Sequence, residues 1–283
     1  MDTLCGLFDK NRQYYYVKVK RIYTEQQRVE LILAYVGYYR TMAPRLGGVK
    51  LHVLLTADLG RDIVRGRDTF LSLLGRHGLT LPKKKPRHTT DSGHVYFKYP
   101  NLAAGLVAEY PNHVWYADIT YVWIEGDVLY LHLVTDGYSH AVLGWCLSLT
   151  LEAENTATAL EMAIAAAGGG NLCGTIHHSD RGVQYACNKY VGILMEHHIR
   201  ISMTERYNPT DNAVAERMNG ILKDEWLYHQ AMFRDYGEAR SEIARMIDFY
   251  NNVRPHMSIG NKKPLDVYHG EVPGRKLWKA KGQ

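Results

Sequence analysis

The chain has 283 residues, of which 46% are hydrophobic and 22% are charged, which is typical of an ordinary globular protein. No run of about 18 apolar residues predicts a membrane span, and the first 30 residues contain no signal-peptide core. The four cysteines lack CxxC spacing, which makes a disulfide scaffold or zinc module an unfavourable interpretation and indicates an intracellular protein with reduced thiols.

Charge is distributed unevenly along the chain. The formal net charge is +5, but residues 1–100 carry 18 Lys and Arg against 8 Asp and Glu, whereas residues 101–283 carry 16 against 21. A basic part followed by an acidic part indicates a nucleic-acid-binding region joined to a region with its own carboxylate chemistry. A solvated basic surface is the alternative, and charge alone does not separate the two.

Residues 1–80 are predicted to be helical. Apolar residues recur at helical spacing over residues 23–39, and Thr24 is a candidate N-cap for that helix. Shorter helices are predicted over residues 49–55 and 69–78, which Gly and Pro separate. Short helices with Gly-containing turns and many arginines favour a helix-turn-helix module, and a small helical bundle without DNA contact is the alternative.

Residues 81–111 are predicted to be a basic, Pro-containing linker. Prolines and like charges both oppose a compact element. Lys83, Lys84 and Lys85 are candidates for contacts with DNA phosphates, since each neutralised phosphate releases counterions. A solvated tether is the plainer interpretation of the same residues.

From about residue 112 the pattern changes to strands and helices. Three strands in a row, the first two joined by the hairpin signal Glu125-Gly-Asp127, precede alternating helices and strands. This order predicts an α/β fold with a mixed five-stranded sheet flanked by helices. The predicted strands cover residues 114–123, 128–135, 141–149, 175–178 and 199–203. The predicted helices cover residues 152–167, 189–197, 212–223 and 236–250.

Three acidic residues carry the functional prediction. Asp118 interrupts a predicted apolar strand, Asp180 ends another short apolar stretch, and Glu216 follows 36 residues later in a helical segment. Two acids at neighbouring strand ends and a third on a helix can converge on one or two divalent metal ions, whose preferred ligands are carboxylate oxygens. Such a metal pair clamps the attacking and leaving oxygens of a phosphoryl displacement.

Each acid also has a plainer interpretation. Asp118 could be bonded to a neighbouring side chain, Asp180 could form a turn, and Glu216 could lie on a solvated helix face. Asp136 also ends an apolar strand, and we interpret it as a turn-former rather than a ligand.

Lys223 lies seven residues after Glu216, so a helix places the two about 20° apart on one face. A metal-binding glutamate followed by a phosphate-binding lysine is expected if that face meets DNA. A surface helix with scattered charges is the alternative, and Asp224 and Glu225 are interpreted as charges of that kind.

Several motifs, in order, resemble one known family. Trp115–Tyr121 is similar to its first-acid strand, His178–Tyr185 to its second-acid motif, and Ser202–Glu216 to its glutamate motif. Tyr250–His256 with Lys263–Leu265 is similar to its C-terminal signature, and Pro44–Leu51 to its helix-turn-helix segment. The family is that of bacterial insertion-sequence transposases of the second-frame, OrfB type, which have a retroviral-integrase-like catalytic core.

The resemblance implies a ribonuclease H-like core in residues 112–270, preceded by a small helical helix-turn-helix domain in residues 1–80 and the linker of residues 81–111. A basic tail of residues 271–283 would follow. It also implies DNA cleavage and strand transfer without a covalent enzyme intermediate. The expected cofactor is Mg²⁺ or Mn²⁺, bound as two ions. The implied metal ligands are Asp118, Asp180 and Glu216, and Lys223 fits the basic position that follows the family's glutamate. The resemblance implies that His178, Arg181 and Asn212 contact DNA or support the metal ligands.

The implied partners are double-stranded DNA, both as transposon ends and as target, and further copies of the chain. An upstream-frame helix-turn-helix partner is expected too, since family transposases usually have that part and this chain starts at Met1 without it. The expected location is the bacterial cytoplasm, in association with the nucleoid and not with a membrane. The alternatives are a ribonuclease H-like structure-selective nuclease, which cuts without joining, and a non-catalytic DNA-binding regulator of transposition.

Overall fold

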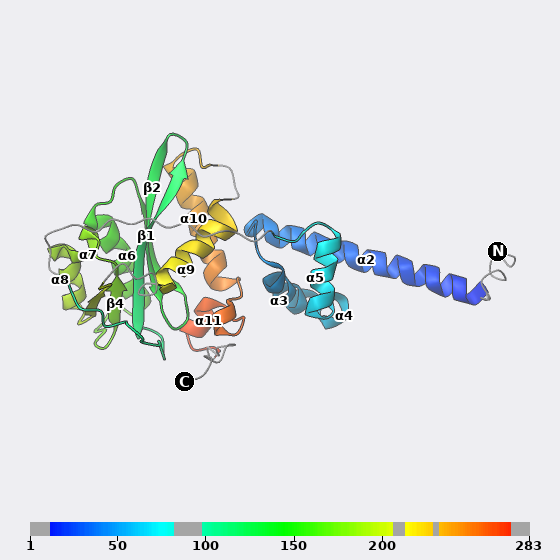
Figure 1. Ribbon diagram of the computed structural model, residues 1–283, viewed down its shortest axis with the longest axis horizontal. Helices are drawn as coiled ribbons and strands as arrows, with labels where there is room; N and C mark the ends of the chain where they lie inside the picture. Colours follow the sequence, from blue (N-terminus) through cyan, green and yellow to red (C-terminus); the bar gives the residue numbers. More distant parts are fainter. Residues whose placement is uncertain (1–11, 82–97, 206–212, 229–231, 273–283) are drawn as a thin grey trace. The chain divides into compact units, whose positions relative to one another are not determined.

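The computed structural model describes residues 12–81, 98–205, 213–228 and 232–272 (Figure 1). The chain divides into two compact units, Met1–Pro82 and Lys83–Gln283, which are described separately. No helix within the described ranges is long and apolar enough to cross a membrane.

The first unit is helical. Its buried side chains come from all four of its helices and include Ile32, Leu55, Val64, Phe70 and Leu74. The helices are α2 (Arg12–Met42), α3 (Gly48–Leu59), α4 (Arg61–Val64) and α5 (Arg67–Arg76).

The first predicted helix is longer than its sequence pattern suggested. The predicted helix of residues 23–39 lies inside α2, which begins at Arg12, so the prediction of Thr24 as an N-cap is wrong. Within α2, Glu25 accepts hydrogen bonds from Arg28 and from Arg65 at the end of α4, and these bonds lower its pKa to about 2. The pair between Glu25 and Arg65 therefore links α2 to the end of α4.

The second unit contains a mixed five-stranded sheet, as predicted. The strands are β1 (Val114–Ile124), β2 (Asp127–Asp136), β3 (Val142–Ser148), β4 (Ile176–Ser179) and β5 (Arg200–Met203). Their order is β3-β2-β1-β4-β5. Strands β1, β2 and β3 form an antiparallel meander, whereas β4 pairs in parallel with both β1 and β5. The meander follows from the short connections, and the parallel pairs follow from the helical crossovers.

Helices cover both faces of this sheet (Figure 1). One face is covered by α6 (Ala153–Ala166), α7 (Val183–Ala186) and α8 (Asn188–Glu196). Helix α9 (Ala213–Leu222), with its continuation η1 (Lys223–Leu227), packs against the other face through Val214. The chain then forms α10 (Tyr236–Asn252), η2 (Met257–Ile259) and α11 (Pro264–Tyr268), and Tyr268 of α11 joins the core cluster of α6.

The approach of α6 to the sheet depends on a glycine in β3. A Cβ atom at Gly144 would lie 1.9 Å from the carbonyl oxygen of Ala159 in α6. Only glycine therefore permits this backbone contact. The small residues Ala159 and Ala163 of α6, both fully buried, complete the close packing.

Candidate active site

Asp118 lies in the middle of β1 and is partly buried. Its Oδ2 accepts a hydrogen bond from Asn219 Nδ2 of α9 at 2.5 Å, and its Oδ1 accepts one from the backbone N–H of Ile119 at 2.9 Å. Loss of contact with water and the negative charge of Asp180 raise the pKa of Asp118 to about 7, whereas both hydrogen bonds oppose the rise. A nearby cation would stabilise the charged form of this carboxyl group.

Asp180 follows β4 directly and lies beside Asp118. The parallel pairing matches Tyr116 of β1 with His178 of β4, so that each acid stands two residues beyond a paired position at the same edge. Neighbouring strands run roughly 4.8 Å apart. The structure therefore brings the two predicted acids together.

The carboxylate of Asp180 is oriented by the turn that follows it. Its Oδ1 accepts a hydrogen bond from the backbone N–H of Gly182 at 2.9 Å. A Cβ atom at position 182 would lie 3.0 Å from that oxygen, so glycine leaves room for the carboxylate.

Glu216 lies on α9, but its side chain is outside the described residues. The helix itself is fixed against β1 through the bond between Asn219 and Asp118. Position 216 precedes Asn219 by three residues, a spacing that puts two positions on the same side of a helix. The backbone therefore gives Glu216 a place on the side of α9 that meets β1.

Lys223 follows α9 by one residue and is half-buried. Burial lowers the pKa of its ammonium group, whereas the negative charges of Asp118 and Asp224 raise it. The ammonium group therefore lies near Asp118. Lys223 lies four residues after Asn219, which contacts Asp118, so it is one helical turn further along the same side and is grouped with the two acids.

The residues predicted to contact DNA differ in their exposure to solvent. His178 is fully buried, and its Nδ1 is hydrogen-bonded to Ser202 Oγ at 2.8 Å, so a direct contact between this side chain and DNA is excluded. Arg181 is half-exposed immediately after Asp180 and stays a candidate. Asn212 and the linker lysines Lys83, Lys84 and Lys85 lie outside the described residues.

Two residues of the site had no predicted role. Asn219 could have been found from its helical spacing, because it lies on the side of α9 between Glu216 and Lys223. Tyr185 is buried, and its hydroxyl has no hydrogen-bond partner among the residues described. Burial, and then the charges of Asp180 and Asp118, raise the pKa of this hydroxyl well above its ordinary value.

Asp136 has a different environment, in keeping with its interpretation as a turn-former. It is fully buried and accepts hydrogen bonds from Asn112 N at 2.8 Å and from both Ser139 N and Ser139 Oγ at 2.7 Å. These donors hold the connection between β2 and β3 closed. The carboxylate thus stabilises a turn.

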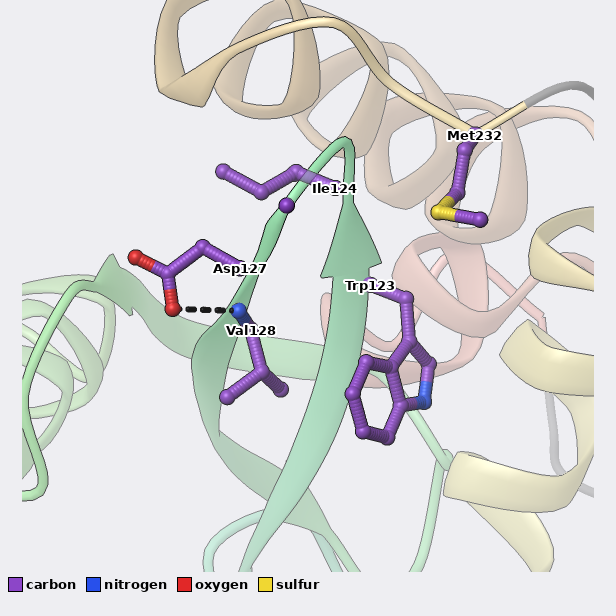
Figure 2. Close-up of a pocket in the computed structure, with 6 residues that line it drawn as sticks. Trp123, Ile124, Asp127, Val128 and Met232 are labelled. Atoms are coloured by element: carbon purple, nitrogen blue, oxygen red, sulfur yellow. Dashed lines mark hydrogen bonds between the residues drawn. The ribbon is translucent and has the colours of Figure 1, made fainter.

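An open cavity of about 410 Å³ lies at the other end of β1, where the hairpin turns (Figure 2). Its walls are mostly apolar, and the Asp127 carboxylate in it accepts a hydrogen bond from Val128 N at 2.7 Å. The cavity is lined by Trp123, Ile124, Gly126, Asp127, Val128 and Met232, none of which belongs to the acidic pair.

The fit of a metal ion rests on the oxygen donors of Asp118 and Asp180. Within the described side chains no group of three His, Cys, Asp or Glu forms a metal cluster. The third predicted ligand, Glu216, is not among those side chains. The pair alone offers carboxylate oxygens, which suit a hard divalent cation.

Two models, each described as "Integrase core domain", match residues 108–209 and 197–264. The "Insertion element IS600 uncharacterized 31 kDa protein" of Shigella sonnei is 34% identical over 280 residues, which cover 94% of this chain and 98% of that protein. The chain belongs to the family of insertion-sequence transposases with an integrase core. The "Putative transposase InsK for insertion sequence element IS150" of Escherichia coli K12 is 30% identical, over 69% of this chain and 68% of that protein.

Solved structures similar to the chain include the catalytic core domain of HTLV-2 integrase in complex with magnesium. It is 20% identical, with a TM-score of 0.43, over 56% of this chain and 98% of that one. Another is the simian T-cell lymphotropic virus intasome in complex with a PP2A regulatory subunit, 20% identical with a TM-score of 0.47, over 83% of this chain and 79% of that one.

The integrase-core matches and the observed sheet order confirm the predicted ribonuclease H-like core. Membership of the family assigns the chain to DNA transposition by an integrase-type core.

Proposed function

We propose that the chain cleaves DNA strands and joins their 3′ ends to another DNA, with Asp118, Asp180 and Glu216 as metal ligands. The observation that carries the proposal is the juxtaposition of Asp118 and Asp180 on adjacent parallel strands, where the charge of one raises the pKa of the other. Two carboxylates so close together repel each other unless a cation lies between them or one is protonated.

The expected cofactor is Mg²⁺ or Mn²⁺, bound as two ions, because the three ligands offer oxygen donors only. When bound, such ions neutralise charge at the phosphate and activate water. The protein's own groups do the positioning. Asn219 holds the Asp118 carboxylate from α9, and Lys223 supplies a positive charge for a DNA phosphate close to it.

DNA binding outside the acidic site is assigned to the basic N-terminal part. Residues 1–80 are proposed as a helix-turn-helix-like DNA-binding region, residues 81–111 as a linker whose Lys83, Lys84 and Lys85 follow phosphates, and residues 271–283 as a basic tail. The proposed substrates are transposon ends and target DNA. Assembly into a homo-oligomer and cooperation with an upstream-frame protein belong to the same proposal.

The test is nicking and joining of supercoiled plasmid by the purified protein in Mn²⁺. The Asp180→Asn variant should lose the products, whereas Asp127→Asn, a change on the exposed hairpin, should keep them. Full activity in Asp180→Asn would overturn the proposed ligands. Nicks without joined ends would favour a structure-selective nuclease, and DNA binding without any product would favour a regulator unless the upstream-frame partner restores activity.

A further inference from the structure

Helix α9 continues as a π-turn rather than ending. In η1 the backbone N–H of Tyr228 donates to the carbonyl oxygen of Lys223 at 2.9 Å, a bond that spans five residues. Turns of this kind are rare and are frequent at functional sites. Here the turn begins at Lys223, near Asp118, and within it Glu225 and Trp226 are buried.

Glu225 is part of a buried ion pair, so its interpretation as a scattered surface charge is wrong. Its two carboxylate oxygens accept hydrogen bonds from Arg254 Nε at 2.7 Å and Nη2 at 2.8 Å. The side chain of Arg254 is 2% exposed and that of Glu225 is 10% exposed. The guanidinium group also lies 5.4 Å from the centre of the Tyr250 ring. A two-point bond of this kind fixes distance and orientation together.

Arg254 is in turn fixed to the sheet. It follows α10, in which the Asn251 amide bonds both the N–H and the C=O of Val142 in β3, at 3.0 and 2.9 Å. The Tyr250 hydroxyl donates to the carbonyl oxygen of His140 at 2.9 Å. The pair therefore connects η1 to the meander of the sheet through α10.

We infer that the Arg254–Glu225 pair is a positioning device, which holds the π-turn so that Lys223 faces Asp118. The inference rests on the proposed function of the acidic site. Apolar residues of similar volume often replace a buried ion pair without loss of stability, so stability alone does not explain the pair. Directional bonds to a planar guanidinium do explain a fixed turn geometry.

The test is the double variant Arg254→Met/Glu225→Leu, which removes the directional bonds and leaves apolar volume. Its melting temperature should stay near that of the wild type. Hydrogen exchange at the Tyr228 amide should become at least about tenfold faster, because that amide closes the π-turn. Plasmid nicking in Mn²⁺ should fall about tenfold. The control Arg245→Met, which breaks an exposed pair with Glu242 on α10, should change none of these.

A second comparison distinguishes a role of the ion pair in positioning Lys223 from a general role in stabilising the fold. Lys223→Ala should lower nicking in the wild type but lower it little further in the double variant, because the two changes act through one group. The inference would be overturned if the Tyr228 amide of the double variant exchanged at the wild-type rate. It would also be overturned if that amide exchanged faster while nicking stayed undiminished. If the double variant does not fold, Arg254→Lys, which keeps the charge but not the two-point bond, takes its place with the same expectations.

The proposed function fails separately. In that case the wild type itself shows no metal-dependent nicking, and the role assigned to Lys223 falls with it. Hydrogen exchange at Tyr228 would still show whether the pair holds the turn.

Discussion

The charge on Asp118 is expected to destabilise the metal-free protein at alkaline pH. The pKa of this carboxyl is about 7, against an ordinary value of 3.8. A difference of about three units corresponds to about 4 kcal/mol. Because the side chain is only partly buried, solvent screening reduces this to about 3 kcal/mol. In Asp118→Asn one acceptor oxygen remains for the Ile119 N–H, and the bond from Asn219 Nδ2 is lost. That loss costs about 1 kcal/mol, so the net gain is about 2 kcal/mol.

The sign follows from proton linkage. The folded state binds the Asp118 proton more tightly than the unfolded state, so the group favours folding most below about pH 4. That contribution to stability is lost as the pH rises to about 7. Above that pH the group has no further effect on the pH dependence of stability. Asp118→Asn should therefore stabilise the protein by about 2 kcal/mol near pH 8 and cost about 1 kcal/mol near pH 4.

The assay is urea unfolding of wild type and variant at both pH values, with a chelator present. The matched control is Asp127→Asn, which removes an exposed acid from the hairpin end of the same sheet. This surface substitution should change the free energy of unfolding by less than about 0.5 kcal/mol at both pH values. The reasoning about Asp118 is refuted if the variant gains no stability near pH 8, or if its effect is the same at both pH values.

Three further outcomes are expected. Gly144→Ala should destabilise the core by about 3 kcal/mol or more, because the new Cβ would meet the Ala159 carbonyl oxygen. Thermal melting measures the loss, and Gly192→Ala, at a position with open space around it, is the control. Tyr185→Phe should leave the free energy of unfolding unchanged or raise it by about 1 kcal/mol, since the hydroxyl removed has no partner among the described residues, and a large loss would contradict that. DNA affinity of the full chain should fall steeply between low and moderate salt, because residues 1–100 are basic, and an affinity independent of salt in a binding titration would contradict their role.

Most of the fold could be predicted because its signals are local. Alternating apolar residues and short turns mark the meander, and the observed limits of the five strands differ from the predicted ones by at most one residue. The start of α2 was missed because Thr24 has the composition of a cap inside a helix that continues. The π-turn could not be predicted, since the bond between Glu225 and Arg254 joins segments far apart in sequence.

The site was predictable where strand order alone decides it. Asp118 and Asp180 meet because β1 and β4 are parallel neighbours, which follows from the crossover between them. The contact predicted for His178 is wrong because all four residues of β4 are buried, as in a strand covered on both faces. No role was predicted for Tyr185, because burial of its hydroxyl depends on how α7 and α8 pack.

The place of Asp118 explains how a strand centre can hold an accessible acid. Pairing with β4 ends at Tyr116, whereas pairing with β2 continues to Ile124, so the later part of β1 extends beyond β4. Helix α9 lies against this extension and donates the Asn219 bond to the acid. Asp118 therefore has strand backbone on one side and a helix on the other, and its carboxylate keeps some contact with solvent. A metal ion or a phosphate can reach it there, whereas the turn donors around Asp136 leave that fully buried acid no such access.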